Sequence, residues 1–290
     1  MIVRFLDIAI GGLLMGGIYA LIAVGFGLQY GVARVLNIAH GEFFMLGAFA
    51  AWTLFTKLEV NPLLSLVLCA PFLFAIGFVI HRIYFAPLRT ASTSAAVFEG
   101  NSMLASFGLL FVIQNLAMII WGGPVKAYSY LATPVNLFGA VFSANRIITL
   151  IVSVVLGSAF YLFLARTRTG KAIRAAAQDP DTAELMGVRI NRVLALCFGF
   201  GAMMAGLGGL LLSMTSLVIT PFMGMEYTLI AIIVVVLGGL GNVKGSFIGG
   251  FILGIVGTIV SYLQPGLSLV AYYVIFLFLL LVRPAGILGK

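Results

Sequence analysis

The chain has 290 residues, of which 62% are hydrophobic and 8% are charged, and its mean hydropathy is +1.21. Soluble globular proteins carry about 25% charged residues, so a chain of this composition has too little polar surface to fold in water. The net charge of +8 does not indicate nucleic acid as a partner, because the basic residues lie in the gaps between apolar runs, as orientation in a membrane requires.

Nine apolar runs follow one another along the chain, and most are long enough to cross about 30 Å of hydrocarbon as helices. They are continuous, whereas the strands of a membrane barrel alternate apolar and polar residues. The runs cover residues 7–29, 43–56, 62–81, 102–121, 146–165, 193–213, 226–241, 246–263 and 265–282. The sequence therefore predicts an all-α bundle of eight or nine spans, embedded in membrane lipid, with residues 1–290 forming a single transmembrane domain.

The second and seventh runs are short for a crossing. Basic loops stay on the cytoplasmic side of a membrane, so the most basic gap, Ala165–Val193, is predicted to be cytoplasmic together with the C-terminus. The side of the N-terminus stays open. Arg34 is inside if the second run crosses and outside if that run is re-entrant, and both alternatives place the same number of basic residues inside.

Glycine is frequent within the runs, with 35 residues in the chain. Small residues recur four positions apart, as in Gly12 and Gly16 and again in Gly250 and Gly254. This spacing lets membrane helices approach closely where lipid provides no hydrophobic drive. It indicates either plain bundle packing or helices that slide past one another during transport.

The basic gap contains the signals of two short helices. Asp179 and Pro180 provide an acceptor at the N-cap and a proline at the first helical position, and Gly187 stands where that helix would end. A preceding helix is predicted over about 169–177. Another Asn-Pro start, at Asn61, is predicted to open the third run.

Two interpretations of this gap differ in function. It is either a solvated loop that only orients the protein, or a docking element that fits a cytoplasmic partner, and the helix signals favour docking. The residues predicted to form this element, within 166–192, are Arg166, Arg168, Gly170, Lys171, Arg174, Ala177, Asp179, Pro180, Glu184 and Gly187.

The segment "LNIAHGEFFMLGAF", residues 36–49, concentrates polar groups beside the short second run. Gly41 would permit a break in the backbone, and Asn37, His40 and Glu42 would satisfy the freed groups and cap a helix that starts after it. Alternatively, these four residues line a substrate path, or His40 and Glu42 relay protons, since ionisable groups within a membrane are candidates for function.

A second break, "GLGNVKGSF", places Asn242 ahead of another glycine-rich run. Paired interruptions can mark internal repeats around a substrate path, so Asn242 is added to the candidate path residues and the two breaks are predicted to be related by symmetry. The same stretch fails as a nucleotide-binding loop, because Lys244 precedes Gly245. Motifs of hydrolases and metalloenzymes are absent from the sequence, so the chain is predicted not to be an enzyme.

Four stretches in order along the chain carry a resemblance to a known family: "LNIAHGEFFMLGAF", "RTRTGKAIRAAAQDPDTAELMGVRINRV", "VLGGLGNVKGSFIGGFILGI" and "RPAGILGK". Together they resemble the LivH-type permease subunit of bacterial ABC importers for branched-chain amino acids. The resemblance covers nearly the whole chain. It implies a multi-pass protein of the bacterial inner membrane, whose solute is a branched-chain amino acid or, as in related importers, another amino acid, an amide or urea.

The resemblance also implies partners. These are a second, LivM-type permease subunit, two cytoplasmic ATPase subunits that bind ATP and Mg, and a periplasmic substrate-binding protein, whereas this chain itself holds no cofactor and no metal. Residues 166–192 resemble the ATPase-coupling region of the family, and Asn37–Glu42 resembles a signature segment near its translocation path. The alternative is a proton-driven secondary transporter that uses His40 and Glu42.

Overall fold

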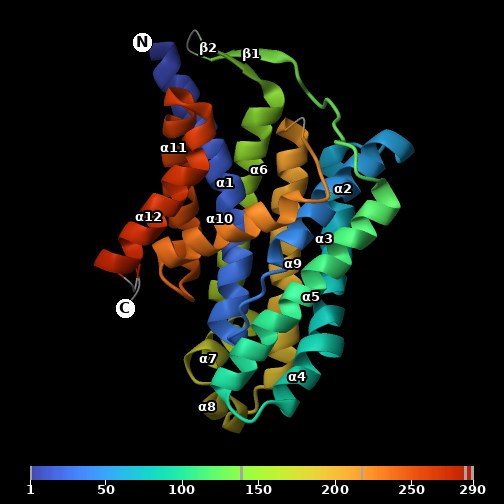
Figure 1. The fold of residues 1–290 in the computed structure, drawn as a ribbon, viewed down its shortest axis with the longest axis vertical. Helices are drawn as coiled ribbons and strands as arrows, with labels where there is room; N and C mark the ends of the chain where they lie inside the picture. Colours follow the sequence, from blue (N-terminus) through green and yellow to red (C-terminus); the bar gives the residue numbers. More distant parts are fainter. Residues whose placement is uncertain (1, 138–139, 217, 284–285, 289–290) are drawn as a thin grey trace.

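The computed structural model describes all residues except 1, 138–139, 217, 284–285 and 289–290, and most of the described chain is helical (Figure 1). The helices are α1 (Ile2–Ala33), α2 (His40–Leu58), α3 (Pro62–Ile80), α4 (Ala86–Ala91), α5 (Ala95–Trp121), α6 (Ala144–Arg166), α7 (Arg168–Gln178), α8 (Pro180–Leu185), α9 (Ile190–Thr215), α10 (Met223–Gly238), α11 (Val243–Leu263) and α12 (Ser268–Val282). A π-helix, η1 (His81–Phe85), joins α3 to α4, and a 3₁₀ turn, η2 (Pro265–Leu267), precedes α12. An antiparallel hairpin, β1 (Pro134–Leu137) and β2 (Ala140–Ser143), precedes α6.

Each of the nine predicted runs forms a helix, which confirms the helical membrane fold. In the described part of the chain, 7 helices are long and apolar enough to cross a membrane. The remaining two runs form α2, with 19 residues, and α10, with 16 residues. The third run was predicted to end at residue 81, but its helix continues through η1 to Ala91. Its start is as predicted, because the side chain of Asn61 accepts the backbone N–H of Leu63.

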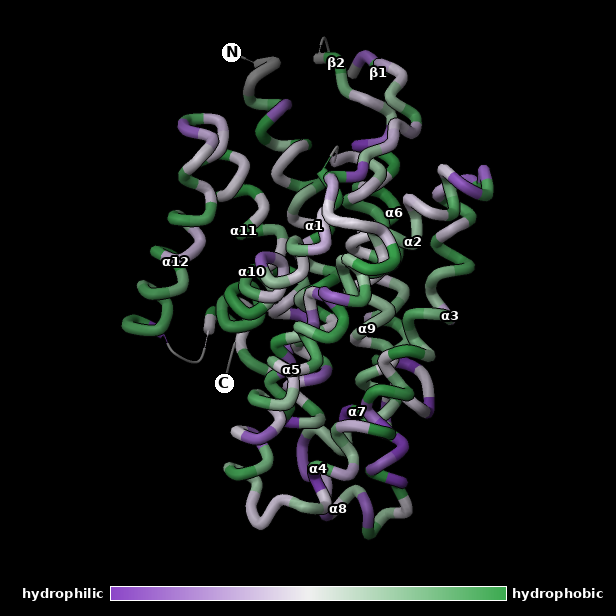
Figure 2. Tube along the Cα trace, turned by 45° about the vertical axis from the view of Figure 1, so that its right-hand side comes forward, coloured by the Kyte–Doolittle hydropathy of each residue, from purple (hydrophilic) through white to green (hydrophobic). Residues whose placement is uncertain are grey.

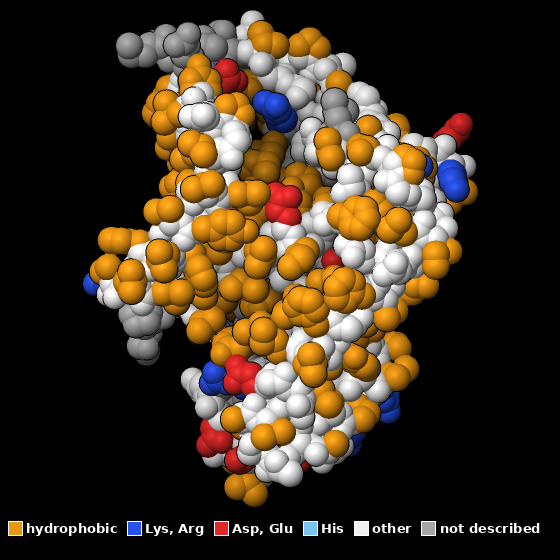
Figure 3. All heavy atoms as spheres, viewed as in Figure 1, with side chains coloured by type: hydrophobic (Ala, Val, Ile, Leu, Met, Phe, Trp, Pro, Cys, Tyr) orange, Lys and Arg blue, Asp and Glu red, His pale blue; other side chains and the backbone are white. Residues whose placement is uncertain are grey.

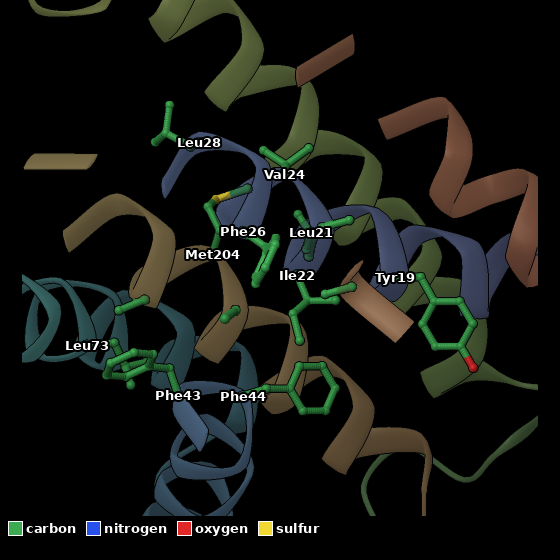
Figure 4. Packing of buried hydrophobic residues seen from close by; sticks show 14 of the residues in the cluster. Tyr19, Leu21, Ile22, Val24, Phe26, Leu28, Phe43, Phe44, Leu73 and Met204 are labelled. Atoms are coloured by element: carbon green, nitrogen blue, oxygen red, sulfur yellow. The ribbon is translucent and has the colours of Figure 1, made fainter. Parts of the chain in front are cut away.

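The bundle is built around α1 and α9, which are mostly buried, whereas α5 and α12 are largely exposed on the outside. Figure 4 shows the core where α1 and α2 both pack against α9, with Ile22 and Phe26 from α1, Phe43 and Phe44 from α2, and Met204 from α9. The exposed apolar side chains of the outer helices are what a helix needs where it faces lipid.

Small residues bring the inner helices into backbone contact, as their spacing predicted. A side chain at Gly12 or Gly16 would overlap the backbone of α11 at Ile255 or Phe251. Conversely, a side chain at Gly254 would overlap Gly16. The four-residue repeats are therefore the surface on which α1 and α11 pack.

The segment from α1 to α2 and the segment from α9 to α10 follow similar paths through the bundle in opposite directions. In Figure 1, α1 descends through the whole bundle, residues 34–39 then turn back to mid-height, and α2 starts there and rises. Helix α9 ascends through the whole bundle, residues 218–222 lie lower, near mid-height, and α10 starts there. Two half-helices thus begin in the middle of the bundle, which is the arrangement of an inverted repeat.

Hydrophilic residues gather at one end of the bundle, around α4, α7 and α8 (Figure 2). Residue Arg34, at the end of α1, lines a cavity together with Pro180 of α8. The end of α1 therefore lies at the α7–α8 end of the molecule. This is the end of the molecule where the sequence predicted Arg34 if the second run crosses, although α2 itself starts only at mid-height.

Candidate functional site

The break before the second run lies in residues 34–39, and Gly41 is inside the helix. Helix α2 begins at His40, and in the part of the chain that the structure describes no side chain caps it. The prediction of a helix capped by His40 and Glu42 after a break at Gly41 was therefore wrong. Asn37 does satisfy a freed backbone group, because its side-chain oxygen accepts the N–H of Ala39 at 3.1 Å.

Gly41 is needed for contact between the two half-helices. Its backbone N–H donates to the hydroxyl of Thr228 on α10 at 2.7 Å, and any side chain at Gly41 would overlap the carbonyl of Gly224. The Thr228 hydroxyl lies 3.0 Å from the carbonyl of Ile38 and 3.2 Å from that of Gly224. The start of α2 and the start of α10 are thus joined through one buried hydroxyl.

His40 is held within a buried polar network. Its Nδ1 lies 3.2 Å from the side-chain oxygen of Gln29, which also accepts the Asn37 amide at 3.2 Å, and its Nε2 lies 3.1 Å from the carbonyl of Ile22. Gln29, Asn37 and His40 are all completely buried. Both ring nitrogens are therefore occupied by groups other than Glu42, and the network anchors residues 37–40 to α1.

Glu42, in the first turn of α2, is completely buried. Among the described residues neither of its carboxyl oxygens has a hydrogen-bond partner. The carboxyl group packs against Gly224, where any side chain would overlap it. It therefore lies between the starts of both half-helices, where the N-terminal ends of the helix dipoles favour a negative charge.

Glu226 was missed by the sequence analysis and lies in the first turn of α10. It is exposed, as are Phe222 and Met225 beside it, and Figure 3 shows an acidic side chain over the beginning of α10 among hydrophobic ones. An acid inside the seventh apolar run was the signal that could have revealed it.

Asn242 lies elsewhere. Its side chain caps α11 by accepting the N–H of Gly245 at 3.1 Å and donates to the carbonyl of Leu288 at 2.9 Å. It lines a cavity with Arg174 of α7, at the α7–α8 end. The predicted symmetry between the breaks at 37–43 and 242–247 was therefore wrong, because the counterpart of 34–39 is the described segment 218–222 before α10.

The two short helices of the basic gap are present as predicted. Thr167 caps α7 through the N–H of Gly170 at 3.0 Å. Asp179 caps α8 by accepting the N–H groups of Asp181 and Thr182 at 3.0 and 3.1 Å. The Thr182 hydroxyl also donates to this carboxylate and, with these backbone donors, lowers the pKa of Asp179 below its usual value. Beyond α8, Gly187 has a φ of +86°.

The surface of this α7–α8 element is both basic and apolar. Ile173 and Ala176 of α7 are buried against the bundle. Leu185 and Met186, at the tip, are 88% and 82% exposed, and the sequence analysis did not single them out. The predicted residues that are exposed here are Arg166, Arg168, Lys171, Arg174, Asp179, Glu184 and Gly187, while Gly170 is buried and Ala177 and Pro180 are half-buried. Large exposed apolar side chains on a polar element are typical of a protein-binding surface.

Residues 8–282 match the family model described as branched-chain amino acid transport system, permease component. The chain belongs to this permease family. It is 31% identical to the high-affinity branched-chain amino acid transport system permease protein LivH of Salmonella typhimurium, over 99% of this chain and 96% of the relative. It is 32% identical to the corresponding protein BraD of Pseudomonas aeruginosa, over 100% and 97% of the two chains.

The fold of the family member is also similar to a solved structure, PsaBC from Streptococcus pneumoniae in complex with Fab. The TM-score is 0.50 at 14% sequence identity, covering 98% of this chain and 97% of the other. This likeness supports the fold. The family match and the 7 helices of the described chain that are long and apolar enough to cross a membrane together make the chain a multi-pass membrane permease.

Proposed function

We propose that this permease is the membrane-spanning subunit of an ATP-driven ABC importer that carries branched-chain amino acids across the bacterial inner membrane. The relatives LivH and BraD support this substrate class, because both are permeases of high-affinity branched-chain amino acid systems. The observation that carries the proposal is the meeting of two half-helix starts in the middle of the bundle, joined at Gly41 and Thr228.

The half-helix starts provide the charges that an amino-acid zwitterion requires. The N-terminal ends of α2 and α10 carry partial positive charge, which suits the carboxylate of the substrate. Glu226 is exposed at the same level and suits its ammonium group. The proposed path residues are therefore those near the half-helices. Asn37, His40, Gly41 and Glu42 form the buried support behind the surface that carries Glu226.

The exposed surface at the start of α10 is also an argument for the presence of a second permease subunit. An exposed carboxylate at mid-membrane depth costs several kcal/mol if it faces lipid, roughly 2.5–3.5 kcal/mol on insertion scales. Covering this surface with a LivM-type partner leaves Glu226 in a shared, watery path. In this arrangement solute passes between the two permeases.

The α7–α8 element is proposed as the contact with the cytoplasmic ATPases, which bind the ATP and Mg. It projects from the bundle, is fixed by side-chain caps at both helix starts, and exposes Leu185 and Met186 at its tip. An ATPase subunit that grips this tip would move α6 and α9, which flank the element in the chain. A substrate-binding protein would dock at the opposite end, and the C-terminus would be cytoplasmic.

The test is reconstitution of the complete transporter in proteoliposomes, with uptake and ATP hydrolysis measured in parallel. The double variant D179A/E184A should hydrolyse ATP while uptake falls about tenfold or more, because one helix cap contributes roughly 1 kcal/mol and its loss frays the α8 contact. Changing Leu185 and Met186 to Ala should weaken ATPase binding itself. Normal uptake by both variants would contradict the coupling role.

The proton-driven alternative is tested in the same experiment by the permease alone. Uptake without ATPase subunits, driven by a proton gradient, would contradict an ABC importer. The structure offers this alternative little support, because the ring nitrogens of His40 face Gln29 and Ile22 rather than Glu42.

A further inference from the structure

A second basic site lies outside the proposed path, between η1 and the start of α9. A cavity of about 630 Å³ is lined there by His81, Arg82, Arg189, Asn191 and Arg192, with Phe78 among its apolar residues. The described lining contains three arginines and no acidic residue. The site therefore presents positive charge without an internal counterion.

His81, one of the residues that line this cavity, has an unpartnered ring nitrogen. The side chain is only 2% exposed, and its Nδ1 has no hydrogen-bond partner within the described chain. The ring packs on Phe198, with ring centroids 4.8 Å apart. It belongs to the five-residue π-helix, and such single-turn insertions are frequent at functional sites. Buried polar atoms are normally paired, so this histidine is an exception in the wall of the cavity.

The start of α9 also favours a negative charge in this cavity. This helix has 26 residues, its first turn carries no acidic residue, and the side chain of Arg189 makes no cap. A long helix with an uncapped N-terminus is an anion-binding element, because its first N–H groups and its dipole favour negative charge. The arginines, the histidine and the helix start converge on the same cavity.

The geometry points to an anionic phospholipid as the ligand, with its phosphate in this cavity. Arginine forks match phosphate oxygens in pairs. Next to these lining residues in the chain, Val79 and Ile83 are 48% and 72% exposed, and acyl chains would lie on these side chains. The site is thus apolar on its membrane side and cationic on the side of the α7–α8 element, as a lipid at the membrane surface requires.

Native mass spectrometry of the purified full-length permease tests this proposal, with phosphatidylglycerol and phosphatidylcholine as probes. Phosphatidylglycerol should remain bound preferentially. The variant R189Q/R192Q should lower that preference about tenfold or more, because each arginine contributes charge-assisted hydrogen bonds. The matched control is R166Q/K171Q, which removes the same charge at the same end of the molecule but outside the cavity lining, and it should retain the preference.

Three further results bear on the source of the bound group. Single replacement R82Q, on an exposed residue, should weaken lipid binding without altering the unfolding temperature, which separates binding from folding. Equal loss in both double variants would overturn the proposal, because general charge would then explain binding. Inorganic phosphate that binds as tightly as phosphatidylglycerol would also overturn it.

The last test measures phosphatidylglycerol binding in the complete transporter, with the ATPase subunits present. If phosphatidylglycerol stays bound when the ATPase subunits are present, the site is a lipid site in the assembled protein. If it is displaced on their addition, the arginines pair with acidic groups of the ATPase instead, and the lipid proposal fails.

Discussion

The starts of α2 and α10 occupy the same level of the bundle but differ in their surroundings. The start of α2 is enclosed, with His40 and Glu42 completely buried and Asn37 tied to Gln29. The start of α10 is open on one side, with Phe222, Met225 and Glu226 exposed. In an inverted pair of half-helices, one start therefore serves as the fixed support and the other as the accessible surface.

The largest loss of stability is expected from a substitution that pushes the start of α2 away from the start of α10. Gly41→Ala places a methyl group against the backbone carbonyl of Gly224, and overpacking of this kind costs about 3 kcal/mol when backbone must move. The matched control is Gly100→Ala, at a helical position with no atom of the described chain within 4 Å of the added group. Thermal unfolding should show a large loss for the first and a gain of up to about 1 kcal/mol for the second.

A smaller effect follows from breaking the hydroxyl bridge. Thr228→Val keeps the shape of the side chain but leaves the buried N–H of Gly41 without its 2.7 Å partner, which costs about 2 kcal/mol. Thr56→Val is the control, because the hydroxyl of this exposed residue bonds only to Trp52 in its own helix. Equal stability of the two variants would show that the bridge does not hold the half-helices together.

Replacing Glu42 or Glu226 with Gln compares the start of α2 with the start of α10 directly. Glu226→Gln should reduce uptake by the reconstituted transporter about tenfold, equal to roughly 1.4 kcal/mol, while the unfolding temperature stays unchanged because the side chain is exposed. Glu42→Gln should not lower the unfolding temperature, because a buried carboxylate without a partner is replaced by a neutral group of the same size. Loss of uptake from E42Q alone would exchange the roles of the two starts.

The smallest effect is expected at Asp179, the exposed N-cap residue of α8. The pKa of Asp179 is lowered in the folded protein by its bonds with Thr182 and Asp181. Its stabilising contribution is therefore present above the unfolded value of about 3.9 and is lost as pH falls through the lower folded value. Amide exchange at Asp181 and Thr182 should speed up, relative to intrinsic rates, below about pH 4. In D179N this pH dependence should be absent.

The sequence predicted what depends on local chemistry and solvent. Run length and composition identified the membrane helices, and Asp179-Pro180 with Gly187 predicted α8 because capping uses neighbouring residues. The sequence alone could not place the break before α2. A glycine is needed at position 41 because its backbone packs against the carbonyl of Gly224, which is distant in the chain. For the same reason Asn242 was paired with the wrong segment, since only the packing of α1 against α9 shows which loops correspond. Glu226 was hidden inside an apolar run, and its exposure depends on the tertiary arrangement.

The central claim is that the start of α10 faces water within the membrane. Cysteine substitution with a membrane-impermeant maleimide tests it, in a background where the buried Cys69 and Cys197 are replaced. Glu226→Cys in the reconstituted transporter should react, whereas Phe278→Cys on the outer helix α12, where the native side chain is 62% exposed, should stay unmodified because it faces lipid. If Glu226→Cys is as unreactive as Phe278→Cys, the half-helix starts do not line a substrate path.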